Sequence, residues 1–171
     1  MLRRVLLVLP LALAACGSQS GAPAALSVER GGIEAIDKAL AAQSGHACLL
    51  NFWATWCAPC VAELPDLLAV ARDYEARGGR VLGVSYDLEI PGVTAEEGVQ
   101  KVRAFLAERG LALPTVVYEA PDELEINAHF GLPGGVPVTL AYDRDGKIVD
   151  RQQGEATRAR FEEMMRKALG P

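Results

Sequence analysis

An α/β fold with a central mixed sheet and helices on both of its faces is the class that this sequence predicts. Short, almost wholly apolar runs alternate with segments of helical periodicity, and the last two short runs are joined by a tight turn. Alternating strands and helices give parallel strands that are covered on both faces, whereas a hairpin adds antiparallel ones. The 171 residues are enough for one such domain and few for two.

The first half of the chain predicts strand, helix, strand and helix in that order. A short strand is expected at 26–29, and a helix at 32–43, where apolar residues recur at the spacing of one helical face. The apolar run 48–53 is typical of a strand buried on both faces. A helix is expected from Cys57 onward, and Pro65 should kink it because proline lacks an amide hydrogen and clashes with the preceding turn.

The second half continues the same alternation and closes with a hairpin and a helix. In order, the expected elements are a strand at 80–86, a helix at 95–109, a strand at 115–118, a helix at 123–130, strands at 138–142 and 147–151, and a helix at 157–169. Gly110 is expected to stop the second of these. The turn Asp143-Arg144-Asp145-Gly146 is a hairpin signal between the last two strands.

The first residues have the layout of a secretory signal. Two arginines precede the apolar run 5–13, which is too short for a spanning helix with normal flanks. Residues 13–16, LAAC, resemble the lipobox of bacterial lipoproteins, which implies removal of 1–15 and lipidation of Cys16. The alternative is an ordinary signal peptide that leaves Cys16 as a free thiol.

The expected organisation is therefore a signal at 1–15, a lipidated N-terminus and flexible tether at 16–30, and one domain at 31–171. After residue 15 the chain keeps 15 basic residues against 22 acidic ones, because two of its 17 basic residues lie in the signal. An acidic protein without a basic stripe is a poor candidate for nucleic-acid binding. Its membrane attachment would come from the lipid, outside the cytoplasm of a bacterium.

Cys57 and Cys60 are the candidate functional residues, and three kinds of site could use such a pair. A zinc site needs four ligands, and Cys48, His46 and His129 supply no second spaced pair. A structural disulfide that closes so short a loop gains little stability. A redox dithiol is therefore favoured, and no metal is expected.

The position of the pair assigns a role to each cysteine. Unpaired amides and the dipole at a helix N-terminus favour a thiolate, so Cys57 is the expected nucleophile. Cys60, one turn further on, is placed to attack a mixed disulfide and release the substrate. Pro59 fits the first helical turn. Cys48, which lies in an apolar run, is expected to be a buried free thiol.

Two segments resemble one family. NFWATWCAPC followed by VAELP, residues 51–65, resembles the active-site segment of thioredoxin-like thiol–disulfide oxidoreductases of the exported TlpA/ResA type. Further on, GVPVT at 135–139 resembles the cis-proline loop of that family, and 143–148 its following hairpin. The resemblance covers 45–169 and implies a thioredoxin-like fold.

The resemblance also implies a set of site residues. Val136–Pro137 would be a cis peptide bond against the disulfide, with the Val136 backbone pairing with a substrate strand. Glu63 matches an acid that would take the proton of Cys60. Asn51 stands where thioredoxin has a buried aspartate. The residues expected to contact substrate are Trp56, Ala58, Pro59, Val136 and Pro137, whereas Trp53 is expected to pack in the core.

The function implied is thiol–disulfide exchange with extracytoplasmic protein thiols, with reduction as the favoured direction. The dithiol carries the electrons, so no organic cofactor is expected. A membrane thiol transporter would be the electron donor, and the protein is expected to be a monomer. Cytochrome c maturation members usually have Pro-Glu-Thr in the loop, and Pro137-Val138-Thr139 departs from it. The helix at 32–43 is more similar to thioredoxin itself, which leaves the subfamily open.

Two other functions are compatible with parts of the sequence. Thiol peroxidases place a threonine three residues before their cysteine, whereas Thr55 precedes Cys57 by two. A copper chaperone could use the cysteine pair together with His129.

Overall fold

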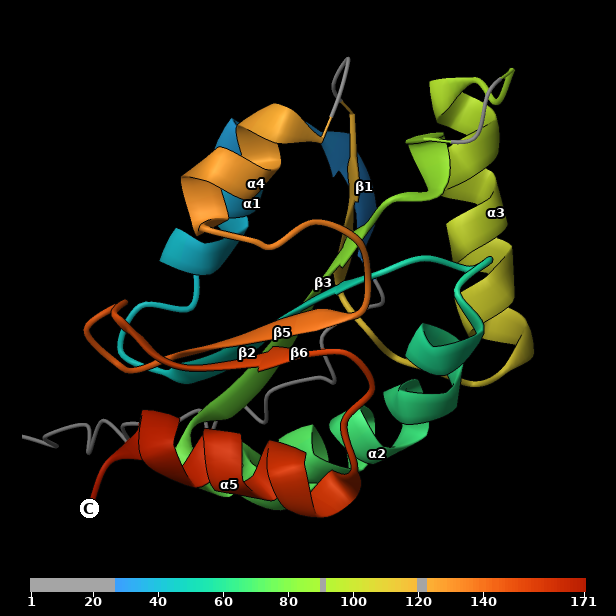
Figure 1. Ribbon diagram of the computed structural model, residues 1–171. Helices are drawn as coiled ribbons and strands as arrows, with labels where there is room; N and C mark the ends of the chain where they lie inside the picture. Colours follow the sequence, from blue (N-terminus) through green and yellow to red (C-terminus); the bar gives the residue numbers. More distant parts are fainter. Residues whose placement is uncertain (1–26, 90–91, 120–122) are drawn as a thin grey trace, which may run out of the picture.

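The computed structural model describes residues 27–89, 92–119 and 123–171. Six strands form one sheet in the order β1-β4-β3-β2-β5-β6, which Figure 1 shows from one edge. The strands are β1 (Val28–Gly31), β2 (Ala47–Trp53), β3 (Gly79–Ser85), β4 (Thr115–Tyr118), β5 (Val138–Tyr142) and β6 (Ile148–Gln153). β1 to β4 pair in parallel, and β5 and β6 are antiparallel.

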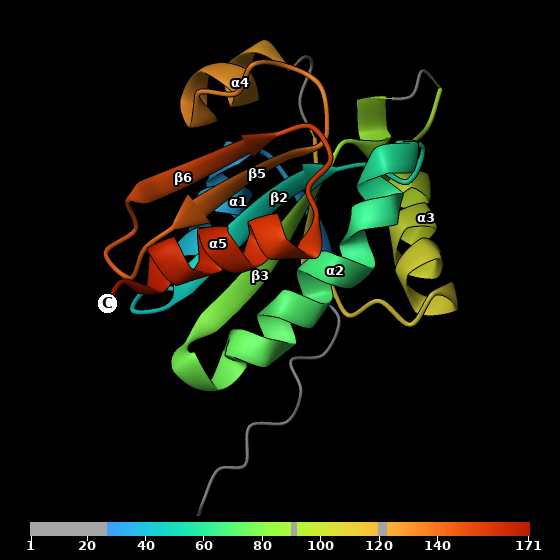
Figure 2. The same ribbon diagram turned by 60° about the horizontal axis from the view of Figure 1, so that its bottom comes forward.

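Helices cover both faces of this sheet. They are α1 (Ile33–Ala41), α2 (Ala58–Tyr74), α3 (Ala95–Glu108), α4 (Leu124–Phe130) and α5 (Arg158–Leu169), with short 3-10 turns at Glu75–Arg77 and Asp87–Glu89. α1 and α4 lie on one face, and α2, α3 and α5 lie on the other (Figures 1 and 2). The sequence prediction of a mixed sheet between helical layers is confirmed, and the fold is thioredoxin-like.

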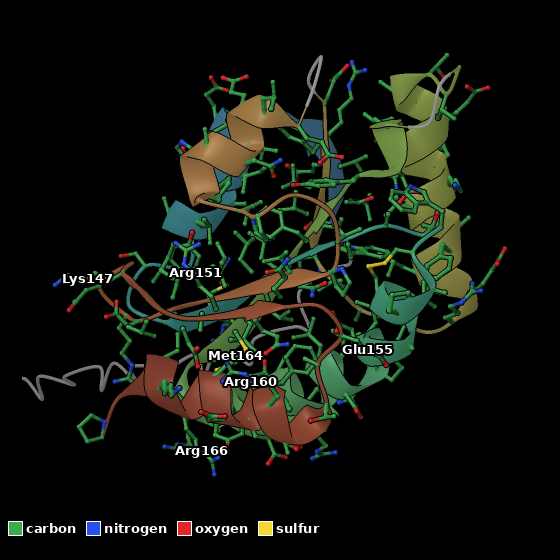
Figure 3. All side chains as sticks on the ribbon, viewed as in Figure 1. Lys147, Arg151, Glu155, Arg160, Met164 and Arg166 are labelled. Atoms are coloured by element: carbon green, nitrogen blue, oxygen red, sulfur yellow. A yellow bond between two sulfur atoms is a disulfide. The ribbon has the colours of Figure 1, made fainter. Side chains whose placement is uncertain are left out.

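β2 is the centre of the fold, and all seven of its residues are buried. Alternate side chains of a strand point to opposite faces, so Phe52 packs on Phe130 of α4 while Trp53 packs on Phe105 of α3. Trp53 is therefore a core residue, as expected. On the lower side, Met164 of α5 is buried and points toward the sheet in Figure 3.

The helix that carries the cysteines begins with a capped first turn. Cys57 is its N-cap residue, and its sulfur accepts a hydrogen bond from Cys60 N at 3.3 Å. Pro59 occupies the first turn, where a missing amide hydrogen costs nothing. Pro65 lies inside α2 without ending it. The carboxyl end of β2 thus leads directly into Cys57.

Most expected elements occur within two residues of their predicted bounds. β1 pairs with β4 from Val28 onward, two residues later than the strand expected at 26–29, and its first three residues fall within the segment 16–30 that was expected to hold the tether. A four-residue strand carries too little periodicity to be bounded from sequence. The predicted signal peptide, Cys16 and residues 17–26 lie outside the described residues. Across the described ranges, every helix is too short or too polar to span a membrane.

Candidate functional site

Cys57 and Cys60 form a disulfide with an S–S distance of 2.03 Å. The two sulfurs differ in access, since Cys57 is 6% exposed and Cys60 is fully buried. Cys57 stands at the positive end of the α2 dipole, where a reduced sulfur would be favoured as the thiolate. An incoming thiol or disulfide therefore reaches Cys57 and not Cys60.

The loop before β5 lies against this disulfide. Val136–Pro137 is a cis peptide bond, as the sequence predicted. The carbonyl oxygen of Val136 is 3.8 Å from Cys57 Sγ. β5 starts at the next residue and pairs with β2, with Val138 opposite Phe52. This pairing brings a segment some eighty residues away along the chain to the Cys57 sulfur.

An exposed rim surrounds Cys57. The Trp56 side chain is 50% exposed, and Ala58 and Pro59 are also exposed. Val136 is partly buried beside them. Beside a disulfide, an exposed indole offers apolar contact area to a molecule that docks there. Four of the five predicted contact residues thus lie at or near the surface around Cys57, whereas Pro137 is buried.

The helix that carries the cysteines also carries a buried acid. Glu63 is 3% exposed and sits on α2 one turn after Cys60. Its Oε1 accepts a hydrogen bond from Asn51 Nδ2 at 2.9 Å, and its Oε2 accepts one from Ala156 N at 2.8 Å. Burial raises the pKa of Glu63, and the two hydrogen bonds offset part of this effect.

The rest of this polar cluster was not predicted. Asn51 Nδ2 also donates to Thr139 Oγ1 at 2.9 Å, and these residues face each other in the β2–β5 register. Asn51 Oδ1 is buried with no hydrogen-bond partner in the described part of the chain. Glu155, on the loop that enters α5 beside α2 in Figure 3, adds to the rise in the Glu63 pKa by charge repulsion. The cluster of Asn51, Glu63 and Thr139 therefore holds one titratable group, Glu63, three residues after Cys60 on α2.

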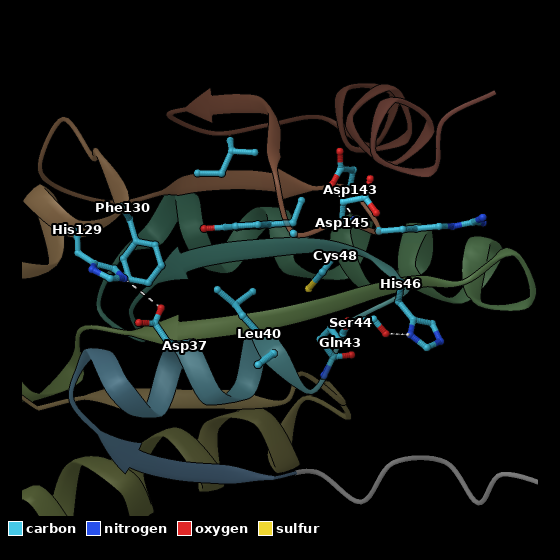
Figure 4. A pocket seen from close by; sticks show the side chains of 15 residues that line it. Asp37, Leu40, Gln43, Ser44, His46, Cys48, His129, Phe130, Asp143 and Asp145 are labelled. Atoms are coloured by element: carbon cyan, nitrogen blue, oxygen red, sulfur yellow. Dashed lines mark hydrogen bonds and ion pairs between the residues drawn. The ribbon is translucent and has the colours of Figure 1, made fainter.

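Cys48 is a free and buried thiol, as expected. Burial raises its pKa to about 12, so almost none of it is thiolate at neutral pH and it is a poor nucleophile. It contributes to the wall of a hollow of about 520 Å³ between α1, α4 and the β5–β6 turn, shown in Figure 4.

His129 lines the same hollow and pairs with Asp37 of α1 at 3.0 Å, so the structure does not bring it to the cysteine pair. No group of three or more potential metal ligands occurs among the residues described.

A thioredoxin-like fold with a Cys-x-x-Cys disulfide at a helix N-terminus, next to a cis-proline loop, defines the class of protein. The family model named Redoxin matches residues 26–168, and the chain belongs to that family. The thiol-disulfide oxidoreductase ResA of Bacillus thuringiensis (strain Al Hakam) is 30% identical over 123 residues, which are 72% of this chain and 64% of ResA. The match thus spans less than two thirds of that relative's length.

Solved structures agree with this assignment. A thiol:disulfide interchange protein of the thioredoxin family from Chlorobium tepidum TLS aligns with a TM-score of 0.61 at 26% identity, over 76% of this chain and 84% of its own. The exposed lipoprotein thioredoxin Etrx1 of Streptococcus pneumoniae aligns with a TM-score of 0.55 at 25% identity, over 74% and 87%.

Proposed function

We propose that this chain is a thiol–disulfide oxidoreductase that exchanges disulfides with protein thiols through Cys57 and Cys60. The observation that carries the proposal is the position of the Cys57 sulfur at the α2 N-terminus, 3.8 Å from the Val136 carbonyl oxygen, in a residue that is 6% exposed while Cys60 is fully buried. The named function of ResA supports it. The dithiol itself stores the two electrons, so the reaction needs no organic cofactor.

In the reducing direction, the Cys57 thiolate attacks one sulfur of a substrate disulfide. The substrate S–S bond breaks, a mixed disulfide with Cys57 forms, and the leaving sulfur departs as a thiolate that takes a proton from solvent. A substrate strand laid along Val136 would pair with its backbone, while Trp56 and Pro59 contact the substrate side chains. The first half of the reaction is thus assigned to the exposed rim.

The second half takes place at the buried cysteine. The Cys60 thiol gives its proton to the Glu63 carboxylate, and the resulting thiolate attacks Cys57 Sγ. The mixed disulfide breaks, the Cys57–Cys60 disulfide forms, and the substrate leaves with both electrons. A raised pKa suits Glu63 to this task because it brings the proton affinity of a carboxylate closer to that of a thiol. A second thiol protein must then reduce the disulfide again.

The location proposed for this reaction is outside the cytoplasm, with the chain held to a bacterial membrane by a lipid on Cys16. Support comes from the layout of residues 1–16 and from the description of Etrx1 as an exposed lipoprotein. In an oxidising compartment a reductant needs an electron supply from the membrane, which makes a membrane thiol transporter the proposed donor. Cytochrome c precursors, whose cysteines must be reduced from a disulfide to two thiols, are one substrate class of this kind.

The proposal is tested by the reduction of insulin disulfides with purified, fully reduced protein. The unaltered chain and Cys48→Ala should both reduce insulin, because Cys48 is buried away from the surface, whereas Cys57→Ser should be inactive. Rapid turnover of hydrogen peroxide in place of insulin would favour a peroxidase. Stoichiometric copper binding that depends on His129 would favour a chaperone. Equal loss of activity in Cys48→Ala and Cys57→Ser would contradict the assignment of the site.

A further inference from the structure

A second buried acid lies close to the cysteines but outside the site described above. Asp87 follows β3 and is fully buried. Its Oδ2 accepts hydrogen bonds from Thr55 N at 2.9 Å and from Ser85 Oγ at 2.8 Å. Its Oδ1 accepts one from the Thr55 hydroxyl and pairs with Lys101 Nζ on α3 at 3.1 Å. Four interactions from three different segments therefore meet on one carboxylate.

This arrangement is costly unless all of its parts are in place. A carboxylate taken out of water needs an opposite charge and several hydrogen bonds to offset its lost hydration. Lys101 supplies the charge while its side chain stays 45% exposed. If the residue after β3 had only to end the strand, a side chain exposed to water could occupy the position of Asp87. The burial of Asp87 indicates that its position serves the segment it binds.

That segment is the turn that leads into the nucleophile. Thr55 stands two residues before Cys57, between the end of β2 and the N-cap of α2. Backbone hydrogen bonds hold the two ends of this turn, from Tyr86 N to Trp53 O at 2.9 Å and from Cys57 N to Ala54 O at 3.2 Å. Asp87 binds both the amide and the hydroxyl of the residue between them.

We propose that Asp87 is a positioning residue of the dithiol, which holds Thr55 so that Cys57 stays at the N-cap against Cys60. It touches neither sulfur, and it acts through the turn. This role rests on the proposed function, because it concerns the same cysteine pair. Asp87 and Lys101 would together help to set the stability of the Cys57–Cys60 disulfide.

The expected consequence follows from effective concentration. Two thiols form an intramolecular disulfide more readily when the fold holds them in contact, because no freedom is lost when the bond forms. A loosened turn would let Cys57 move away from Cys60. The equilibrium between dithiol and disulfide would then shift toward the dithiol, and the chain would become a stronger oxidant.

The test measures the equilibrium constant for oxidation of the dithiol in glutathione buffers. Asp87→Ala should lower this constant about tenfold, which corresponds to a rise of about 30 mV in the redox potential for two electrons. Thr55→Val, which removes only the hydroxyl, should lower it about threefold. Thr55→Ser keeps the hydroxyl and should lie closer to the unaltered chain than Thr55→Val does.

Asp150→Ala is the matched control. It breaks another largely buried ion pair, with Arg160 and Lys167 of α5, on the edge strand β6. The free energy of unfolding of Asp150→Ala should fall, while its equilibrium constant for oxidation of the dithiol in glutathione buffers should equal that of the unaltered chain. The proposal is overturned if Asp87→Ala and Thr55→Val keep the constant of the unaltered chain, or if Asp150→Ala shifts it as much. If Asp87→Ala does not fold, the comparison of Thr55→Val with Thr55→Ser decides the question alone.

This test is independent of substrate turnover. Should the unaltered chain fail to reduce insulin while Asp87→Ala still shifts the glutathione equilibrium, the proposed function would be wrong and the role of Asp87 would stand.

Discussion

Asn51 of β2 donates a hydrogen bond to Glu63 of α2 across 2.9 Å, and both side chains are buried. The amide cannot titrate, so the pair contains one acid whose protonation can change. Because Asn51 also binds Thr139 of β5, the position of the Glu63 carboxyl group depends on the register of two strands. The sheet thus fixes the position of Glu63, the base proposed for the second half of the reaction.

Replacing Glu63 with glutamine should slow the release of substrate from the mixed disulfide. Glutamine keeps the size of the side chain but cannot take the Cys60 proton, and loss of a general base costs on the order of 10²-fold. The attack by Cys57 should be unchanged. The lifetime of a mixed disulfide with a labelled peptide measures the effect, and Glu163→Gln on the exposed side of α5 is the control. Equal lifetimes for Glu63→Gln and the unaltered chain would remove Glu63 from the mechanism.

The same acid predicts how stability changes with pH. Burial raises the folded-state pKa of Glu63 above the ordinary value of 4.5, so the folded chain binds this proton more tightly than the unfolded chain. Its contribution to the free energy of unfolding is full below the ordinary pKa and is lost as the pH rises through the raised one. Urea unfolding at a series of pH values should show this decline in the unaltered chain and not in Glu63→Gln. Parallel curves for the two proteins would contradict it.

Cys48 should resist thiol reagents in the folded protein. Its pKa of about 12 leaves almost no thiolate at pH 8, and its side chain is buried. When the reduced chain is treated with iodoacetamide and digested, the Cys57 peptide should be labelled within minutes and the Cys48 peptide should remain unlabelled. Both should react after unfolding in urea. Rapid labelling of Cys48 in the native protein would show that the hollow of Figure 4 admits reagents to the sulfur.

Trp56→Ala should lower the activity toward protein disulfides and leave the activity toward small disulfides unchanged. The indole is half exposed beside the nucleophile, so its loss removes contact area with a large substrate and changes the stability of the fold by less than about 0.5 kcal/mol. We expect kcat/KM for insulin to fall about tenfold, with the rate toward a small aromatic disulfide unchanged. Val149→Ala truncates another exposed apolar side chain, on β6, and should change neither rate. An equal fall for both disulfides would mean that Trp56 acts on the sulfur itself.

The sequence predicts features that lie within one element or motif better than it predicts contacts between segments far apart along the chain. Hydrophobic periodicity places the strands and helices because each pattern is complete within one element. The Cys57-to-Cys60 spacing and the Val136–Pro137 loop are found because each is a short motif in a fixed order. The strand β1 lies two residues later than predicted, because four residues are too few to show a periodic pattern.

The polar contacts could not be predicted in the same way. The pairing of Asn51 with Thr139 depends on the β2–β5 register, which the sequence does not specify across 88 residues. The amide of Ala156 reaches Glu63 only because the loop before α5 folds over α2. Asp87 follows a strand, as many solvated loop acids do, and only its burial distinguishes it from them.

The most direct test of the roles of Cys57 and Cys60 is the trapping of a mixed disulfide with an oxidised protein substrate. Cys60→Ser should accumulate a covalent adduct through Cys57, because the buried serine cannot resolve it. Cys57→Ser should form no adduct, since the remaining sulfur is fully buried. Mapping of the linked peptides by mass spectrometry identifies the bond. An adduct through Cys60 in Cys57→Ser, with none through Cys57 in Cys60→Ser, would contradict the account.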